Sequence, residues 1–224
     1  ALGELEPAIL KEQAAALVAK LDDPDVYMRR AAVESLGKLN PKDLAEFAAS
    51  LVTMLDDSED EVRDPAVEAL GKLEPSVLKE HAAALIARLE DSSGNVRRAA
   101  VETLGKLKPA TIVQHTSSLV GSLNDSNENV RRAALKTLGR LPPTSLAQHA
   151  ALVVERLDDS DEDVRRAALK TLGKLDPTVL AQHAAALVAK CGDGHGSVRR
   201  AAMDTLGKLE PTVLAQYAAS LSLA

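Results

Sequence analysis

The feature that most constrains this chain is a strict internal repeat. The dipeptide Leu-Gly recurs every 34 residues, and a proline follows each of its glycines four residues later, without insertion or deletion. The glycines are Gly3, Gly37, Gly71, Gly105, Gly139, Gly173 and Gly207. A fixed period of this length is typical of proteins in which one supersecondary unit stacks on copies of itself. The sequence therefore predicts an open array of repeats.

Each repeat predicts two helices joined by a polar turn. In residues 177–210, the apolar positions from Leu180 to Cys191 follow the i, i+3, i+4 spacing of one helical face, behind a proline suited to a first turn. A second series of the same kind runs from Val198 to Leu209. In the turn of the fifth repeat, Ser160 is expected to cap the second helix, with Asp163 completing a capping box. A single hairpin of this kind leaves an apolar stripe exposed, which an identical neighbour can cover.

We therefore expect an all-α fold, an α-solenoid in which antiparallel helix pairs form a right-handed superhelix of about 13 helices. Residues 1–224 are interpreted as one domain. The full repeats are 7–40, 41–74, 75–108, 109–142, 143–176 and 177–210, and a half repeat is 211–224. Because only Tyr27, Phe47 and Tyr217 are aromatic, the core must be built from leucine, valine and alanine.

Composition excludes several classes of protein. The net charge of −6 argues against a chain that mainly binds a phosphate backbone. The single cysteine, Cys191, excludes an internal disulfide and a thiolate metal cluster. The sequence has no apolar run of about 18 residues and no signal-peptide pattern at its start, so we expect a soluble protein in the cytoplasm or another intracellular compartment and no membrane partner.

The repeat also resembles a known family. A proline that opens the first helix, an aspartate in the turn and a Val-Arg pair that opens the second helix are together similar to HEAT repeats, particularly the short variants of phycobilisome lyases and consensus-designed arrays. Tetratricopeptide repeats share the 34-residue period, but they require large aromatics at fixed positions, which this sequence lacks. The resemblance covers the whole chain. It implies that the second helices line the concave side of the solenoid.

Two charged residues recur in every full repeat. The resemblance implies a structural ladder in which each arginine bridges the turn aspartates of its own repeat and the next one. Such a partner is needed because a cation in the first turn of a helix opposes the helix dipole. The aspartates are Asp23, Asp57, Asp91, Asp125, Asp159 and Asp193, and the arginines are Arg29, Arg63, Arg97, Arg131, Arg165 and Arg199.

A histidine column invites a metal hypothesis, which the spacing does not favour. Equivalent atoms of His81, His115, His149 and His183 should lie about 10 Å apart, whereas the ligands of one ion lie about 2 Å from it. The HEAT-repeat deoxyhypusine hydroxylases hold iron through His-Glu pairs, which are missing here. Cys191 lies near Asp193 and His195 but occupies a leucine position of the repeat, so it is interpreted as core.

No nucleophile, phosphate-loop, zinc-finger or dinucleotide motif is present in the sequence. We therefore expect no enzyme, no catalytic residue, no metal and no cofactor. The function predicted from the residues is a protein-interaction scaffold.

A basic stripe is the candidate binding site. At three positions spaced four residues apart on the second helix, most repeats mix acidic and basic residues, whereas the fourth and fifth repeats carry only basic ones. These six residues are Arg132, Lys136, Arg140, Arg166, Lys170 and Lys174. Our hypothesis is that they grip an acidic peptide or protein segment. The alternative is a solvated lysine-rich face chosen for helix propensity.

Two other functions stay open at this point. The likeness to short HEAT repeats also suggests a bilin lyase or chromophore chaperone. The basic stripe suggests a weak nucleic-acid backbone binder, which the lack of interleaved aromatics disfavours for single strands. Because neither end of the sequence looks like a polar cap, we expect a piece of a longer array that can self-associate end to end.

Overall fold

A computed structural model describes residues 12–217 of the chain. Residues 7–11 of the first repeat and 218–224 of the half repeat, with the predicted end-to-end contact through them, lie outside this range. The described part is helical and contains no strand, which confirms the all-α prediction. Its internal contacts divide it into two compact units on either side of the Thr111–Ile112 bond, here called unit 1 and unit 2. The interpretation as one domain stays a prediction.

The described helices of unit 1 recur in the order of the repeat, and the repeats differ only in where short 3-10 turns occur. They are α2 (Ala14–Ala19), α3 (Val26–Leu36), α4 (Pro41–Leu44), η2 (Ala45–Phe47), α5 (Ala48–Thr53), η3 (Met54–Asp56), α6 (Asp60–Leu70), α7 (Pro75–Glu80), α8 (Ala82–Ala87), η4 (Arg88–Glu90) and α9 (Gly94–Leu104), where η marks a 3-10 turn. The helix α10 (Pro109–Gln114) contains the division between the units.

Unit 2 continues in the same order. Its described helices are α11 (Thr116–Gly121), η5 (Ser122–Asn124), α12 (Glu128–Leu138), α13 (Pro143–Ala147), α14 (Ala150–Glu155), η6 (Arg156–Asp158), α15 (Glu162–Leu172), α16 (Pro177–Leu180), η7 (Ala181–His183), α17 (Ala184–Ala189), η8 (Lys190–Gly192), α18 (Gly196–Leu206) and α19 (Pro211–Ala215).

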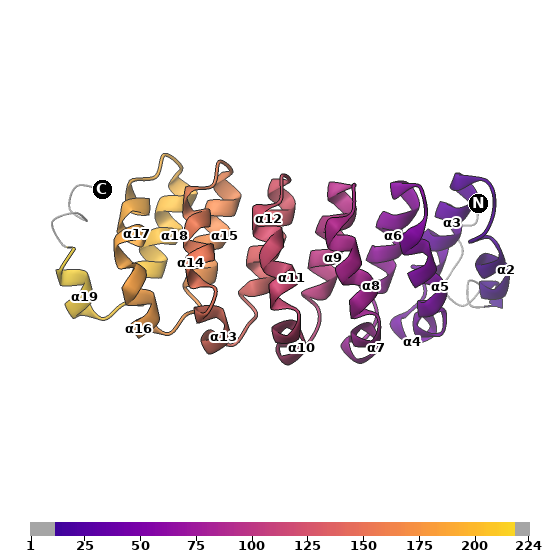
Figure 1. The fold of residues 1–224 in the computed structure, drawn as a ribbon, viewed down its shortest axis with the longest axis horizontal. Helices are drawn as coiled ribbons and strands as arrows, with labels where there is room; N and C mark the ends of the chain where they lie inside the picture. Colours follow the sequence, from indigo (N-terminus) through magenta and orange to yellow (C-terminus); the bar gives the residue numbers. More distant parts are fainter. Residues whose placement is uncertain (1–11, 218–224) are drawn as a thin grey trace. The chain divides into compact units, whose positions relative to one another are not determined.

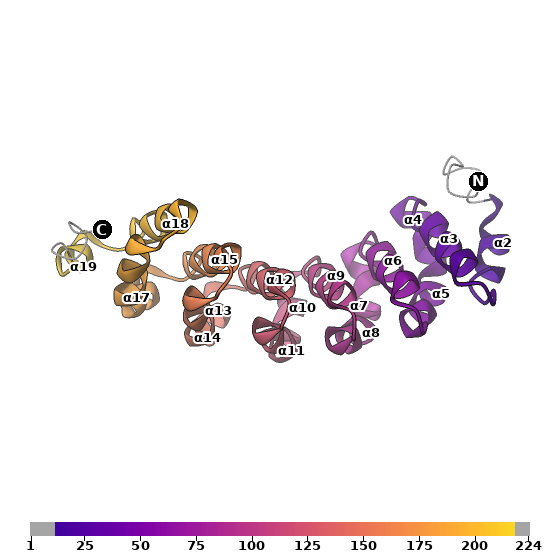
Figure 2. The same ribbon diagram turned by 90° about the horizontal axis from the view of Figure 1, so that it is seen from above.

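Each unit has two layers of helices (Figures 1 and 2). The second helices of the repeats form one layer, in which α6 packs between α3 and α9 in unit 1, and α15 packs between α12 and α18 in unit 2. The first helices form the other layer, where α8 contacts α9 and α14 contacts α15. The core between the layers consists mainly of leucine, valine and alanine, as the composition predicts.

The first helix of each full repeat differs from the single helix that its periodicity predicts. It is divided at the column that holds the histidines: His81, for example, has φ −105° and ψ 8°, outside the helical region, and lies between the end of α7 and the start of α8. The next residue is small and buried in each of the six full repeats, as Ala82 and Ala150 show. The break therefore lets the second half of the first helix pack closely against the second helix.

The invariant glycine of the second repeat, Gly71, packs closely against the third repeat. Gly71 ends α6 in an ordinary right-handed conformation, so a positive φ is not the reason for it. A Cβ atom built on Gly71 would lie 2.8 Å from Oγ1 of Thr103 and 2.9 Å from Nζ of Lys106. These side chains belong to the next repeat, and Nζ of Lys106 donates to the carbonyl oxygen of Gly71 at 2.8 Å. A side chain at this position would therefore force the side chains of Thr103 and Lys106 to move.

The capping box predicted at Ser160 is wrong. The residue that caps α15 is Asp161, whose Oδ1 accepts a hydrogen bond from the amide of Val164 at 3.0 Å. The helix therefore begins one residue later than the turn sequence suggested, and this leaves Asp163 free for the ion pairs described below.

The remaining predicted candidates are placed as follows. Cys191 is buried in the core, and this burial raises the pKa of its thiol. Within residues 12–217, no three side chains of histidine, cysteine, aspartate or glutamate are grouped so that they could hold a metal ion. None of the helices in the same range has both the length and the apolar character that crossing a bilayer requires.

Candidate functional site

The predicted ladder residues are brought together across repeats. Nε and Nη2 of Arg63 donate to the two carboxylate oxygens of Asp91, in the next repeat, at 2.8 and 2.9 Å. Its Nη1 donates to the carbonyl oxygens of Asp57 and Ser58, in its own turn, at 2.8 and 2.9 Å. The contact within the repeat is thus made to main-chain carbonyl oxygens, and the contact to the next repeat is made to a carboxylate.

The other repeats use the same geometry. The further carboxylate pairs are Arg29 with Asp57, Arg131 with Asp159, and Arg165 with Asp193. Arg97 and Arg199 donate to the main-chain carbonyls of Asp91 and Asp193, Arg131 to that of Asp125, and Arg29 to that of Asp23. The arginine at the start of each second helix is therefore compensated by the turn at its own helix and, in these four pairs, by the carboxylate of the following repeat.

Burial and pairing set the charge state of the ladder. Burial by itself raises the pKa of Asp91, but hydrogen bonds from the Arg63 guanidinium and the Ser93 amide outweigh it and leave the pKa lowered. The same balance lowers the pKa of Asp159, with Arg131 and the amide of Asp161 as its partners. Both carboxylates are therefore ionised at neutral pH, as bidentate pairing with arginine requires.

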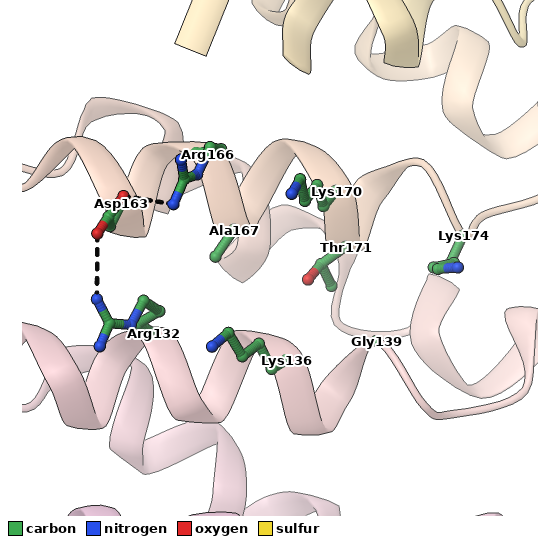
Figure 3. Close-up of a pocket in the computed structure, with 9 residues that line it drawn as sticks. All are labelled: Arg132, Lys136, Gly139, Asp163, Arg166, Ala167, Lys170, Thr171 and Lys174. Atoms are coloured by element: carbon green, nitrogen blue, oxygen red, sulfur yellow. Dashed lines mark hydrogen bonds and ion pairs between the residues drawn. The ribbon is translucent and has the colours of Figure 1, made fainter. Parts of the chain in front are cut away.

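The candidate binding site is a groove between α12 and α15, both in unit 2. It has a volume of about 290 Å³ (Figure 3). Its lining residues are Arg132, Lys136, Gly139, Asp163, Arg166, Ala167, Lys170, Thr171 and Lys174. Five of the six basic residues predicted as a partner-binding stripe are among them, whereas Arg140 is exposed and does not line this groove.

The helices place these side chains by their four-residue spacing. Lys136 follows Arg132 by one turn of α12, and Lys170 follows Arg166 by one turn of α15, so each helix presents two cations on one edge of the groove. Between the helices, Oγ1 of Thr171 donates to the carbonyl oxygen of Leu135 at 2.9 Å and fixes their register. The side chains of Ala167 and Thr171 are buried, so they form a small, neutral floor beneath a cationic rim.

At one end of the groove, the two arginines are already paired with a carboxylate of the groove lining. The carboxylate of Asp163 lies 3.2 Å from Nη1 of Arg132 and 2.6 Å from Nη2 of Arg166 (Figure 3). This is the residue that sequence reasoning missed, because it was interpreted as part of a helix cap. Its position three residues before Arg166 was the available signal.

The rest of the groove carries uncompensated positive charge. Lys136, Lys170 and Lys174 are exposed, and none of their ammonium groups forms an ion pair or hydrogen bond with another residue of the described chain. Lys106 occupies the position of Lys174 in the third repeat, and there the ammonium group donates to the carbonyl oxygen of Gly71 in the preceding repeat. The groove can therefore offer three ammonium groups to an anionic ligand without breaking an existing contact.

The equivalent groove of unit 1 has the opposite charge. It lies along α3 and α6 and reaches the start of α9, and Arg30 is its only lining cation against five acids: Glu34, Asp60, Glu61, Asp64 and Glu68. Arg30 is itself paired, with Glu34 at 2.8 Å and Glu61 at 3.6 Å. Asp64 stands where five other repeats have arginine, and its Oδ1 is buried with no hydrogen-bond partner in the described chain. A basic groove is thus a property of unit 2 and not of the repeat in general.

Comparisons with solved structures show the fold. The chain is similar to a designed armadillo repeat protein in complex with the peptide (KR)4, at a TM-score of 0.70 and 21% identity over 88% of this chain and 100% of that one. A computationally designed armadillo repeat protein for modular peptide recognition matches at a TM-score of 0.68 and 22% identity, over 87% and 99%. An engineered protein matches at a TM-score of 0.70 and 17% identity, over 88% of this chain and 96% of that one.

The family is shown by the sequence itself. No curated protein matches the chain. A family model for HEAT repeats matches residues 14–84, 82–152 and 150–222, which together cover nearly all of the described chain. A fold of this kind commonly serves as a protein-interaction scaffold. Taken together with the helix pairs and the arginine–aspartate ladder, these matches show that the chain belongs to the HEAT-repeat family.

Proposed function

We propose that this protein is a non-catalytic interaction scaffold that holds an acidic segment of a partner protein in the groove between α12 and α15. The observation that carries the proposal is the set of three exposed lysines, Lys136, Lys170 and Lys174, which line one groove without counterions in the described chain. Like charges one turn apart weaken a helix by a few tenths of a kcal/mol, so a ligand that neutralises them gains free energy at this site.

The chemistry of the groove favours carboxylates of a polypeptide. Its floor is small and neutral, and the cations stand on two different helices, so an extended chain can lie between them with its side chains directed to both rims. Structural neighbours include repeat proteins made to bind peptides. The bound peptide of one neighbour, (KR)4, is basic, and the opposite charge of this groove favours the opposite kind of peptide.

The test is fluorescence anisotropy with a labelled poly-glutamate peptide. We expect measurable binding by the unaltered protein, and at least about a tenfold loss for the double variant Lys136→Glu with Lys170→Glu, because two attractive charges become repulsive. The matched control is Lys42→Glu with Lys79→Glu, which makes the same charge change at exposed residues of α4 and α7 in unit 1. Equal losses in both double variants would show a non-specific charge effect and refute the site.

A single-stranded oligonucleotide serves as the second ligand. If it binds more tightly than the peptide and loses affinity steeply with added salt, the groove is a phosphate-backbone site, and the proposal of a protein partner is wrong. We expect weaker binding, because the groove has no aromatic side chain on which a base could stack.

A further inference from the structure

The groove between α12 and α15 does not end at α15. A second groove, of about 660 Å³, lies between α15 and α18 and shares Arg166 and Lys170 with the first. Because α15 packs against both α12 and α18, the two grooves are neighbours on the same layer of unit 2. Figure 2 shows these three helices side by side in that layer.

The second groove adds a further unpaired cation. The guanidinium of Arg200, on α18, is exposed and forms no ion pair or hydrogen bond with another residue of the described chain, whereas that of the neighbouring Arg199 donates to the carbonyl oxygens of Asp193 and Gly194. One free cation is thus available on each helix in turn, Lys136 on α12, Lys170 on α15 and Arg200 on α18.

The spacing of the helices limits what can bind all three cations. Packed helices lie about 8–10 Å apart, and Arg200 lies about one helical turn before the position on α18 that corresponds to Lys170, so the three cations mark a path of roughly 18–22 Å across the helices. A polyproline II segment rises about 3.1 Å per residue with three residues per turn, so every third side chain lies on one face at intervals of about 9 Å. This interval matches the distance from one helix to the next.

From this match we propose that the partner segment is an extended acidic stretch of at least seven residues, with acidic side chains at positions i, i+3 and i+6 that pair with Lys136, Lys170 and Arg200. The inference rests on the proposed function and adds to it the conformation, length and acidic spacing of the ligand. Lys170 is shared by both grooves, so it takes the central acidic side chain. Asp163 and Asp204, the acids that line the two grooves, lie beside this path and disfavour a segment with acids at every position.

The test compares three peptides made only of glutamate and proline. The first has three Glu-Pro-Pro triplets, the second has two such triplets, and the third has the composition of the first but its three glutamates are consecutive. We expect the spaced nine-residue peptide to bind up to about fivefold more tightly than the peptide with consecutive glutamates, since one exposed ion pair contributes up to that factor.

The variant Arg200→Glu tests whether the third acidic side chain of the peptide pairs with Arg200. It should weaken the three-triplet peptide by about fivefold or more and leave the two-triplet peptide within about twofold of its original affinity, because the shorter peptide can occupy Lys136 and Lys170 alone. Lys79→Glu in unit 1 is the matched single-charge control. The side chain of Arg200 has no ion pair or hydrogen bond that its replacement would break, and far-ultraviolet circular dichroism verifies that the variant is folded.

The outcomes separate the two proposals. Binding that depends on Lys136 and Lys170, but not on glutamate spacing or Arg200, overturns this inference and keeps the proposed function. Absence of binding for all three peptides and for poly-glutamate overturns both. A loss on Arg200→Glu that is equal for short and long peptides overturns the inference, because it would show a general charge effect.

Discussion

Replacement of Asp159 by asparagine tests whether the ladder holds the repeats together. Asp159 accepts hydrogen bonds from Nη2 and Nε of Arg131 at 2.7 and 2.8 Å, and the two side chains are only 5% and 11% exposed. Asparagine keeps the shape, but it removes the charge and turns one amide donor toward the guanidinium. Breaking a buried pair by removing one partner costs about 3–5 kcal/mol. Because Arg131 keeps its contacts to the carbonyl oxygens of Asp125 and Ser126, we expect about 3 kcal/mol.

The assays are thermal unfolding and urea unfolding, both followed by far-ultraviolet circular dichroism. For a chain of this size, a loss of about 3 kcal/mol corresponds to a melting temperature lower by roughly 6–12 °C. In urea, the slope of the free energy of unfolding against urea concentration is fitted together with the midpoint. A change in this slope would show that the repeats no longer unfold together. The double variant Arg131→Met with Asp159→Leu should recover part of the loss, since it leaves no buried charge without a partner.

The matched control is Glu34→Gln, which removes the same charge from the Arg30–Glu34 pair of α3. Those side chains are 46% and 45% exposed, so we expect a loss of less than about 0.5 kcal/mol. If Asp159→Asn costs no more than this control, the ladder contributes no more than a surface ion pair, and the reasoning is refuted.

Three further predictions concern charge. Asp163→Asn should raise the affinity for the acidic peptides by about threefold to tenfold in the anisotropy assay, because it removes the carboxylate that pairs with Arg132 and Arg166. Weaker binding would show that Asp163 is needed to position these two arginines. Asp64→Asn should raise the free energy of unfolding at pH 7 by about 1 kcal/mol, because burial and the nearby Glu68 raise the pKa of this carboxyl. In urea unfolding at several pH values this gain should shrink as pH falls, since the native carboxyl then becomes protonated, and a gain independent of pH would contradict the reasoning. The ladder aspartates, unlike Asp64, stabilise the folded protein when they are ionised, because their pKa values are lower in the folded than in the unfolded chain. This stabilisation is complete above the unfolded pKa of about 3.9 and is lost as the pH falls through their folded pKa values. We therefore expect the ladder aspartates to change the urea midpoint little between pH 7 and about pH 5, and the midpoint to fall steeply below about pH 4. A fall that is already complete at pH 5 would show that these carboxylates do not have lowered pKa values.

The sequence alone determined the repeat and its helical class. The unbroken 34-residue period, the proline at the start of each first helix and the apolar spacing in each half lead to stacked helix pairs, because an amphipathic hairpin buries its apolar stripe only against a copy of itself. The sequence also identified the basic residues of the groove, since side chains four apart share a helical face whatever surrounds the helix.

Tertiary structure decided how those residues are used. Local periodicity cannot show that the first helix breaks at the position of His81, because the break depends on packing against the second helix. It cannot show that Asp163 binds Arg132 from the preceding repeat, since these residues meet only when α12 and α15 are packed side by side. The invariant Gly71 likewise has no local reason for its identity: its conformation is ordinary, and the side chains of Thr103 and Lys106 in the next repeat are what exclude a Cβ atom.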